Sequence, residues 1–153
     1  MTRPEAFEEY YKLAGFVQAY DGYFLGIKAW GVSVSAAAIG AGFSAAVATS
    51  RASQVAVFCI AGVLSLASWA SEVMMKMLQV AHVYRLVALE QALAGNSEIS
   101  GPAYLSSFSE AQGLNRLTRR WRKVARFPHV AFPHVVFLCA SVVLAILAAV
   151  DVI

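Results

Sequence analysis

Three long runs almost free of charge limit what this chain can fold into more than any other feature. They cover residues 29–49, 55–71 and 130–150. Each is close to the roughly 20 apolar residues that an α-helix needs to cross a hydrocarbon core about 30 Å thick. The segment 36–48 has no charged side chain on any face, whereas a helix on the surface of a soluble protein needs a polar face. We therefore predict three transmembrane helices.

Composition supports the same fold class. The chain has 153 residues, of which 59% are hydrophobic and 14% are charged, whereas soluble domains carry about 25% charged residues. Acidic residues at Glu5, Glu8, Glu9 and Asp21 argue against a secretory signal peptide. The expected fold is an all-α integral membrane protein with three transmembrane helices, an amphipathic N-terminal helix and a cytoplasmic helical region.

The expected organisation follows the apolar runs and the turn signals between them. An amphipathic helix (1–22) precedes the first span (23–49), and Asp21-Gly22 can bend the chain between them. A turn (50–54) leads to the second span (55–76). The cytoplasmic region (77–127) divides into a helix (77–94), a loop (95–107) and a basic amphipathic helix (108–127). The third span (130–152) starts with Pro133 in its first turn.

The positions of the cations predict the orientation. All but one of the 12 Lys and Arg residues lie in the segment up to Lys28 or in the long segment from Lys76 to Arg126, and Arg51 alone lies in the turn between the first two spans. Because cytoplasmic segments are enriched in Lys and Arg, the N-terminus should be cytoplasmic and the C-terminus outside. The Ala-rich spans suit a bacterial cytoplasmic (inner) membrane.

Lys28, Glu72 and Lys76 lie near the cytoplasmic ends of the first two spans. At about 1.5 Å per residue, Glu72 lies about 26 Å along the second span from Val55, which is close to the membrane edge. The hairpin places Lys28 within side-chain reach of Glu72. One interpretation is an interfacial ion pair among these three residues. The other is that Glu72 lines an ion or proton route, because ionisable groups inside membranes are often functional.

Small residues form two stripes along the first span. The first stripe contains Gly22, Gly26, Ala29, Ser33, Ala37, Gly40 and Ser44, and the second contains Gly31, Ser35, Ala38, Gly42 and Ala45. The glycines expected to pack helices are Gly22, Gly26, Gly31, Gly40 and Gly42. Such stripes let helices approach closely in lipid. One stripe is enough to pack against the second span, which is the hairpin partner. We therefore expect the other stripe to pack against the third span or against a second subunit. A polar pore or packing face is predicted from Ser33, Ser35, Ser44, Ser65, Ser68 and Glu72.

A cationic cluster precedes the third span at Arg116, Arg119, Arg120, Arg122, Lys123 and Arg126. A basic amphipathic helix next to a membrane span favours contact with anionic inner-leaflet lipids and not with nucleic acid. His82, His129 and His134 all fall on the cytoplasmic side. Histidines sense pH and bind metals in other proteins, so a pH switch and a metal site are alternatives here, but we expect no metal and no other cofactor.

No sequence motif for catalysis occurs, so we expect no enzyme. The first hypothesis is a small oligomeric inner-membrane protein that forms an ion-conducting pore, because three spans alone cannot enclose a water path. One alternative is a non-conducting accessory or scaffold subunit, which would dock a membrane partner on the apolar surface of residues 75–93. The other is a membrane-targeting toxin or defence effector, since the layout is similar to that of small membrane effectors in bacterial defence operons.

Overall fold

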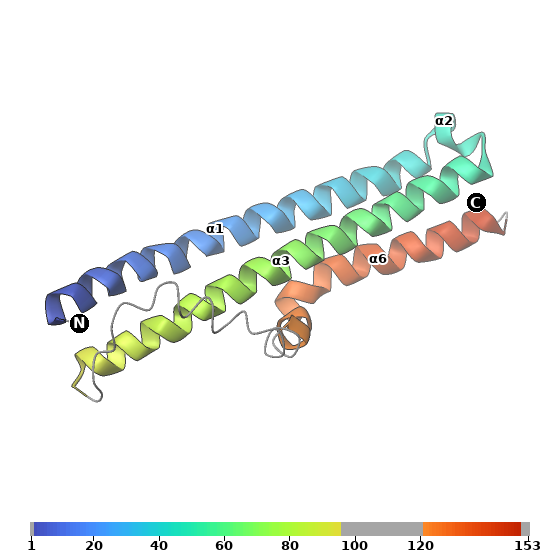
Figure 1. Ribbon diagram of the computed structural model, residues 1–153. Helices are drawn as coiled ribbons and strands as arrows, with labels where there is room; N and C mark the ends of the chain where they lie inside the picture. The colour runs from blue at the N-terminus through green and yellow to red at the C-terminus, as the bar shows by residue number, and fades with distance from the viewer. Residues whose placement is uncertain (1, 96–120, 151–153) are drawn as a thin grey trace. The chain divides into compact units, whose positions relative to one another are not determined.

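The computed structural model describes residues 2–95 and 121–150, and these are helical apart from short turns. The helices are α1 (Arg3–Gly42), the single turn α2 (Ala45–Ala48), α3 (Arg51–Leu93) and α6 (Pro128–Ala149) (Figure 1). Residues 121–125 are also helical. Within the described residues, α1, α3 and α6 are long and apolar enough to cross a membrane.

The chain forms two compact units. The helix-pair unit contains Met1–Phe24 and Met74–Val124, and the three-helix unit contains Leu25–Val73 and Ala125–Ile153. α1 and α3 each contribute to both units. These divisions fall within a few residues of the sequence-based boundaries at 22/23 and 76/77.

α1 continues through Asp21-Gly22, where the sequence allowed a bend. Contacts from α3 hold this segment: Gln79 Nε2 donates to the Asp21 carboxylate over 2.8 Å and to the Val17 carbonyl over 3.2 Å. At the start of α1, the Thr2 backbone N–H donates to the Glu5 carboxylate over 2.8 Å. This bond satisfies an N–H group that the first helical turn leaves without a partner.

The core of the helix-pair unit consists of apolar side chains from α1 and α3. Ala6, Leu13 and Leu89 are buried at its centre. Arg85 binds both carboxylate oxygens of Glu9, over 2.8 and 3.0 Å. α3 ends at Leu93, and Gly95 has φ +83°, a backbone conformation that suits glycine after a helix.

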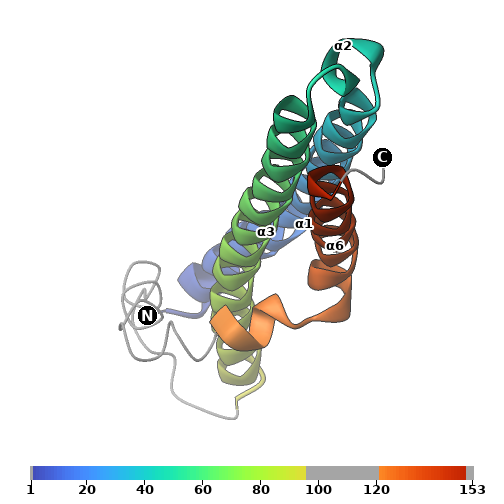
Figure 2. The same ribbon diagram turned by 90° about the vertical axis from the view of Figure 1, so that its right-hand side faces the viewer.

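In the three-helix unit, α1 ends at Gly42, short of the predicted limit at residue 49. A Cβ at Gly42 would lie 2.3 Å from Phe58 Cε1, so the close approach of the fully buried Phe58 ring requires glycine. Gln54 Nε2 donates to the Gly42 carbonyl over 3.3 Å, which satisfies an acceptor at the helix end. α2 lies in the turn that joins α1 to α3, and α6 runs beside both helices (Figures 1 and 2).

The start of α6 differs from the sequence-based expectation. The helix begins at Pro128, so Pro128 occupies the first turn and Pro133 lies inside the helix. A proline has no backbone N–H, so Pro133 leaves the carbonyl of residue i−4, His129, without its usual helical partner. Lys28 Nζ donates to that carbonyl over 2.6 Å. A side chain of α1 therefore replaces the hydrogen bond that Pro133 removes.

Candidate functional site: a buried charged cluster between three helices

One ionisable side chain from each long helix meets inside the three-helix unit. Lys28 from α1 lies 3.1 Å (Nζ to Oε1) from Glu72 of α3. His134 of α6 lies 2.9 Å (Nε2 to Oε2) from the other oxygen of the same carboxylate. The side chains of Glu72 and His134 are each 2% exposed and that of Lys28 is 30% exposed. We call Lys28, Glu72 and His134 the charged cluster.

Backbone contacts hold the charged cluster in place. Ser65 Oγ on α3 donates to the His134 carbonyl over 2.8 Å. Lys28 donates to the His129 carbonyl, as described above, and so connects α1 to both α3 and α6. The close packing of the helices here also requires glycine at residue 31. A Cβ at Gly31 would lie 2.6 Å from Ser68 Cβ and 3.4 Å from His134 Cε1. Gly31 therefore allows α1 to approach α3 and α6 at the cluster.

The sequence predicted the Lys28–Glu72 contact but missed His134. The sequence signal that could have identified His134 as a partner of Glu72 was its position near the same membrane edge. Placing Pro133 in the first helical turn instead of inside α6 left the histidine at the mouth of the span. Lys76, the third member of the predicted ion pair, donates to Gln79 Oε1 over 2.6 Å and lies 5.0 Å from the Phe24 ring centre.

The side chains of the predicted polar face lie partly inside the unit and partly on its outer surface. Ser35, Ser65, Ser68 and Glu72 are buried, whereas Ser33 and Ser44 are exposed. Ser35 Oγ and Ser68 Oγ have no hydrogen-bond partner within the described part of the chain. The buried serines lie on the same inward faces of α1 and α3 as the cluster, so polar groups concentrate inside the unit.

The two stripes of small residues also separate. Gly31 and Gly42 of the second stripe are buried against α3. A Cβ at Gly22, Gly26 or Gly40 would meet nothing within 4 Å. Every member of the first stripe is exposed, namely Gly22, Gly26, Ala29, Ser33, Ala37, Gly40 and Ser44. The second stripe therefore supplies the packing within the chain, and the first stripe remains on the outer face of α1.

The other predicted sites are partly described. Arg122, Lys123 and Arg126 are exposed, whereas Arg116, Arg119 and Arg120 lie outside the described residues. His82 belongs to the helix-pair unit and packs near Tyr20, with ring centres 5.6 Å apart. No group of three His, Cys, Asp or Glu side chains suited to a metal ion occurs in residues 2–95 and 121–150.

The chemistry of the charged cluster favours proton transfer over cation binding. Lys28 places a positive charge beside the Glu72 carboxylate, so a metal cation at this carboxylate would be repelled. Glu72 and His134 share a hydrogen bond between two groups that both accept and release protons. Imidazole is a common proton carrier in proteins.

The fold and the cluster define a class: an all-helical protein with three helices that could span a membrane and a buried charged cluster between them. Comparison of the chain with protein-family models, with curated proteins and with solved structures finds no match.

Proposed function

We propose that this chain is a small integral protein of the bacterial inner membrane that self-associates and conducts ions, with the proton as the ion that its buried cluster handles. The charged cluster is the observation that carries the proposal. Its three members come from three apolar helices, and two of them are almost completely buried. Ionisable groups at such positions in membrane proteins commonly belong to ion or proton pathways.

The energetics argue that the cluster serves more than stability. Taking charges out of water is expensive, and the mutual attraction of buried charges often only offsets that cost. Apolar side chains of similar size are frequently as stabilising or more so. A cluster held by Ser65, Gly31 and the His129 carbonyl is therefore better explained by a role in proton movement.

Membrane insertion is supported by the outward faces of the helices. Large apolar side chains are exposed on all three, including Trp30 (59%), Ile60 (54%) and Ile146 (57%). A bilayer would cover these side chains, whereas water would leave them as an unfavourable apolar surface. The exposed Arg122, Lys123 and Arg126 precede α6, and their charge favours a cytoplasmic location for this segment, next to anionic lipids.

Self-association is supported by the exposed stripe of α1. Small residues on a membrane helix allow another helix to approach closely, and the three helices of one chain use only the second stripe. Ala37→Leu on the exposed stripe should therefore reduce the oligomer mass in nanodiscs. Ala36→Leu is the matched control, because Ala36 is also exposed but lies outside the stripe. A monomeric wild-type chain would contradict self-association.

Conduction is tested with purified protein in liposomes that contain a pH-sensitive dye. Wild-type protein should dissipate an imposed pH gradient, and the triple variant Lys28→Met, Glu72→Leu, His134→Leu should not. Because Lys28→Met also removes the donor to the His129 carbonyl, thermal unfolding of the variant is measured alongside, and flux is compared at a temperature at which both proteins are folded. Glu8→Gln, at an exposed carboxylate paired with Lys12, is the control. Equal flux through the triple variant would refute a role for the cluster.

A second candidate function, a scaffold that docks a partner, is favoured by the helix-pair unit. Phe7 (43%), Tyr11 (70%), Val83 (39%) and Val87 (43%) are exposed there. A scaffold would co-purify with a larger membrane protein at a fixed ratio and would show no flux in liposomes. An ion-conducting oligomer would instead depolarise cells that overproduce it. Depolarisation would also make the protein toxic, as the alternative of a toxic effector requires.

A further inference from the structure

Two buried hydroxyl groups near the charged cluster have no hydrogen-bond partner in the described part of the chain. They are Ser35 Oγ on α1 and Ser68 Oγ on α3, and the two residues are only 1% and 3% exposed. A buried polar group without a partner has lost its hydrogen bonds to water, so such groups are rare in folded proteins and each needs an explanation. Alanine at either position would avoid this cost.

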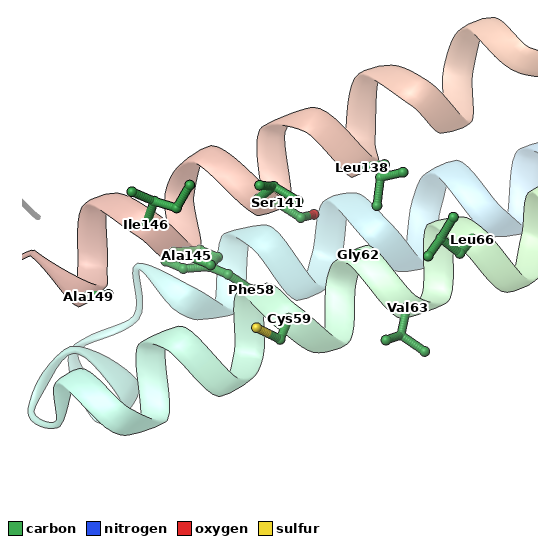
Figure 3. Close-up of a pocket in the computed structure, with 11 residues that line it drawn as sticks. Phe58, Cys59, Gly62, Val63, Leu66, Leu138, Ser141, Ala145, Ile146 and Ala149 are labelled. Atoms are coloured by element: carbon green, nitrogen blue, oxygen red, sulfur yellow. The ribbon is translucent and has the colours of Figure 1, made fainter.

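The other two buried serines among the described residues are hydrogen-bonded. Ser65 Oγ donates to the His134 carbonyl over 2.8 Å, and Ser141 Oγ donates to the Phe137 carbonyl over 2.7 Å. Ser141 lies opposite Gly62 of α3, where a Cβ would be 3.5 Å from Ser141 Cβ (Figure 3). The two unpartnered hydroxyls differ from these serines because both can still donate and accept a hydrogen bond.

The hydroxyl of Ser68 lies close to the imidazole of His134. The position that a Cβ of Gly31 would occupy is 2.6 Å from Ser68 Oγ and 3.4 Å from His134 Cε1. The hydroxyl and the ring carbon are therefore at most about 6 Å apart, roughly the span of two hydrogen bonds of about 2.8 Å each through one water. Because Gly31 has no side chain, it places no atom at this position between the two groups.

Ser35 extends the polar interior by about one helical turn. It follows Gly31 by four residues on α1, so the two residues lie on the same face, about 6 Å apart along the axis. Gly31 faces Ser68 of the antiparallel α3, so Ser35 is level with the turn of α3 that contains Ser65. Hydroxyl groups from both helices therefore continue from the charged cluster toward the middle of the unit.

The polar interior ends at Phe58. The segments 36–42 of α1 and 55–64 of α3 contain no hydroxyl, amide or charged side chain. Phe58 is fully buried, and its ring packs against Gly42. At the opposite end, the side chain of Lys28 is 30% exposed. The interior of the unit is thus polar on the side of Lys28 and apolar on the side of Phe58.

We propose that Ser35 and Ser68 bind water inside the three-helix unit and that this water exchanges protons with His134. Buried water usually binds to polar groups that otherwise have no partner. His134 Nε2 is hydrogen-bonded to Glu72, so the ring nitrogen that meets the water is Nδ1, which is bonded to the same Cε1.

The proton transfer needs no group beyond the imidazole and the water. When the imidazole is protonated, the Nδ1–H bond breaks and its electron pair stays on the nitrogen. The proton joins the water to form hydronium, and the reverse step returns it. The serine hydroxyls both accept and donate hydrogen bonds, so they hold the water in either state. The role in proton transfer rests on the function proposed above, whereas the water site does not.

Solid-state NMR tests the water site independently of conduction. Full-length protein with labelled serines is placed in bilayers, and Ser→Ala variants assign the signals. Magnetisation should pass from water to the Cβ atoms of Ser35 and Ser68 several-fold faster than to that of Ser141, which is also 1% exposed but has a hydrogen-bonded hydroxyl. Rates at Ser35 and Ser68 no faster than the rate at Ser141 would overturn the water site.

The liposome assay with the pH-sensitive dye tests the role in proton transfer. The double variant Ser35→Ala, Ser68→Ala should lower the proton flux several-fold and should stay folded, because neither hydroxyl bonds to a protein group in the described residues. Thermal unfolding checks that it does. Ser71→Ala is the control, since Ser71 is exposed on the same helix as Ser68 and donates only to the Ala67 carbonyl.

Each result of the flux assay has a separate meaning. A lower flux in the double variant with an unchanged flux in Ser71→Ala would support proton transfer through the water. Wild-type flux in the double variant would overturn that role. A wild-type protein that passes no protons would refute the proposed function and the proton role with it, and the NMR rates would still decide whether Ser35 and Ser68 bind water.

Discussion

At the scale of single residues, the charged cluster depends on a contact that only glycine allows. Gly31→Ala would place a Cβ 2.6 Å from Ser68 Cβ, an atom fixed to the backbone of α3, so the helices must separate. We expect a loss of about 1–3 kcal/mol in the free energy of unfolding, which is typical of overpacking. Reversible unfolding in mixed micelles measures it.

Gly15→Ala is the control for that substitution. Gly15 also lies inside α1, but a Cβ there would meet nothing within 4 Å. Replacing a helical glycine by alanine in open space should stabilise the protein by about 0.5–1 kcal/mol. Equal effects of the two substitutions would mean that the close approach at Gly31 has no energetic weight.

Tyr10 gives a residue-scale prediction about pH. Its hydroxyl donates to Glu90 over 2.9 Å, and this hydrogen bond to the carboxylate raises the pKa of Tyr10 above its ordinary value of 10.0. The phenol must stay protonated to donate. Its contribution to stability is therefore complete below pH 10.0 and is lost as the pH rises through the raised pKa.

The stability difference between wild type and Tyr10→Phe should accordingly be constant up to about pH 10 and shrink above it. Chemical unfolding at a series of alkaline pH values measures this difference. Tyr11→Phe is the matched control, because the neighbouring Tyr11 is 70% exposed. A difference that persists unchanged at strongly alkaline pH would show that the hydrogen bond to Glu90 does not contribute.

At the scale of helices, Pro133 and Lys28 should be energetically coupled. Pro133 removes the helical partner of the His129 carbonyl, and Lys28 donates to that carbonyl instead. In a Lys28→Met background the carbonyl loses this donor, and Pro133→Ala would supply a backbone N–H. Pro133→Ala should therefore stabilise the Lys28→Met variant by about 1 kcal/mol more than it stabilises the wild type.

A double-mutant cycle from unfolding free energies measures the coupling. Additive effects would mean that Lys28 does not replace the missing helical hydrogen bond. Lys28→Met alone should also remove the positive charge that pairs with Glu72. The informative quantity is therefore the coupling free energy between the two substitutions, and not the loss of stability in a single variant.

The sequence was most informative about where helices form and least informative about which side chains meet between them. Hydropathy and length predicted three long apolar helices because both are local properties. Helical spacing also separated the small residues of α1 into two stripes. Which stripe packs within the chain depends on distant contacts, such as those of Gly31 with Ser68 and of Gly42 with Phe58. The contribution of His134 was missed for the same reason, because it depends on where α6 begins.

At the scale of the whole molecule, membrane insertion requires lipid to cover the outer faces of α1, α3 and α6. The two native cysteines report on this directly. Cys59 on α3 and Cys139 on α6 both carry free, exposed thiols in the described structure, and both fall within apolar runs. Water would leave these thiols reactive, whereas a hydrocarbon core would exclude a charged reagent.

Labelling of cells with a membrane-impermeant, charged maleimide therefore tests whether lipid covers α3 and α6. Ser53→Cys, at an exposed position near the α2–α3 turn, provides a thiol that should react from outside. We expect rapid labelling at residue 53 and none at Cys59 or Cys139, both in intact cells and in sealed or opened vesicles. Both native thiols should react after denaturation. Rapid labelling of Cys59 and Cys139 in native, detergent-free opened vesicles would contradict membrane insertion.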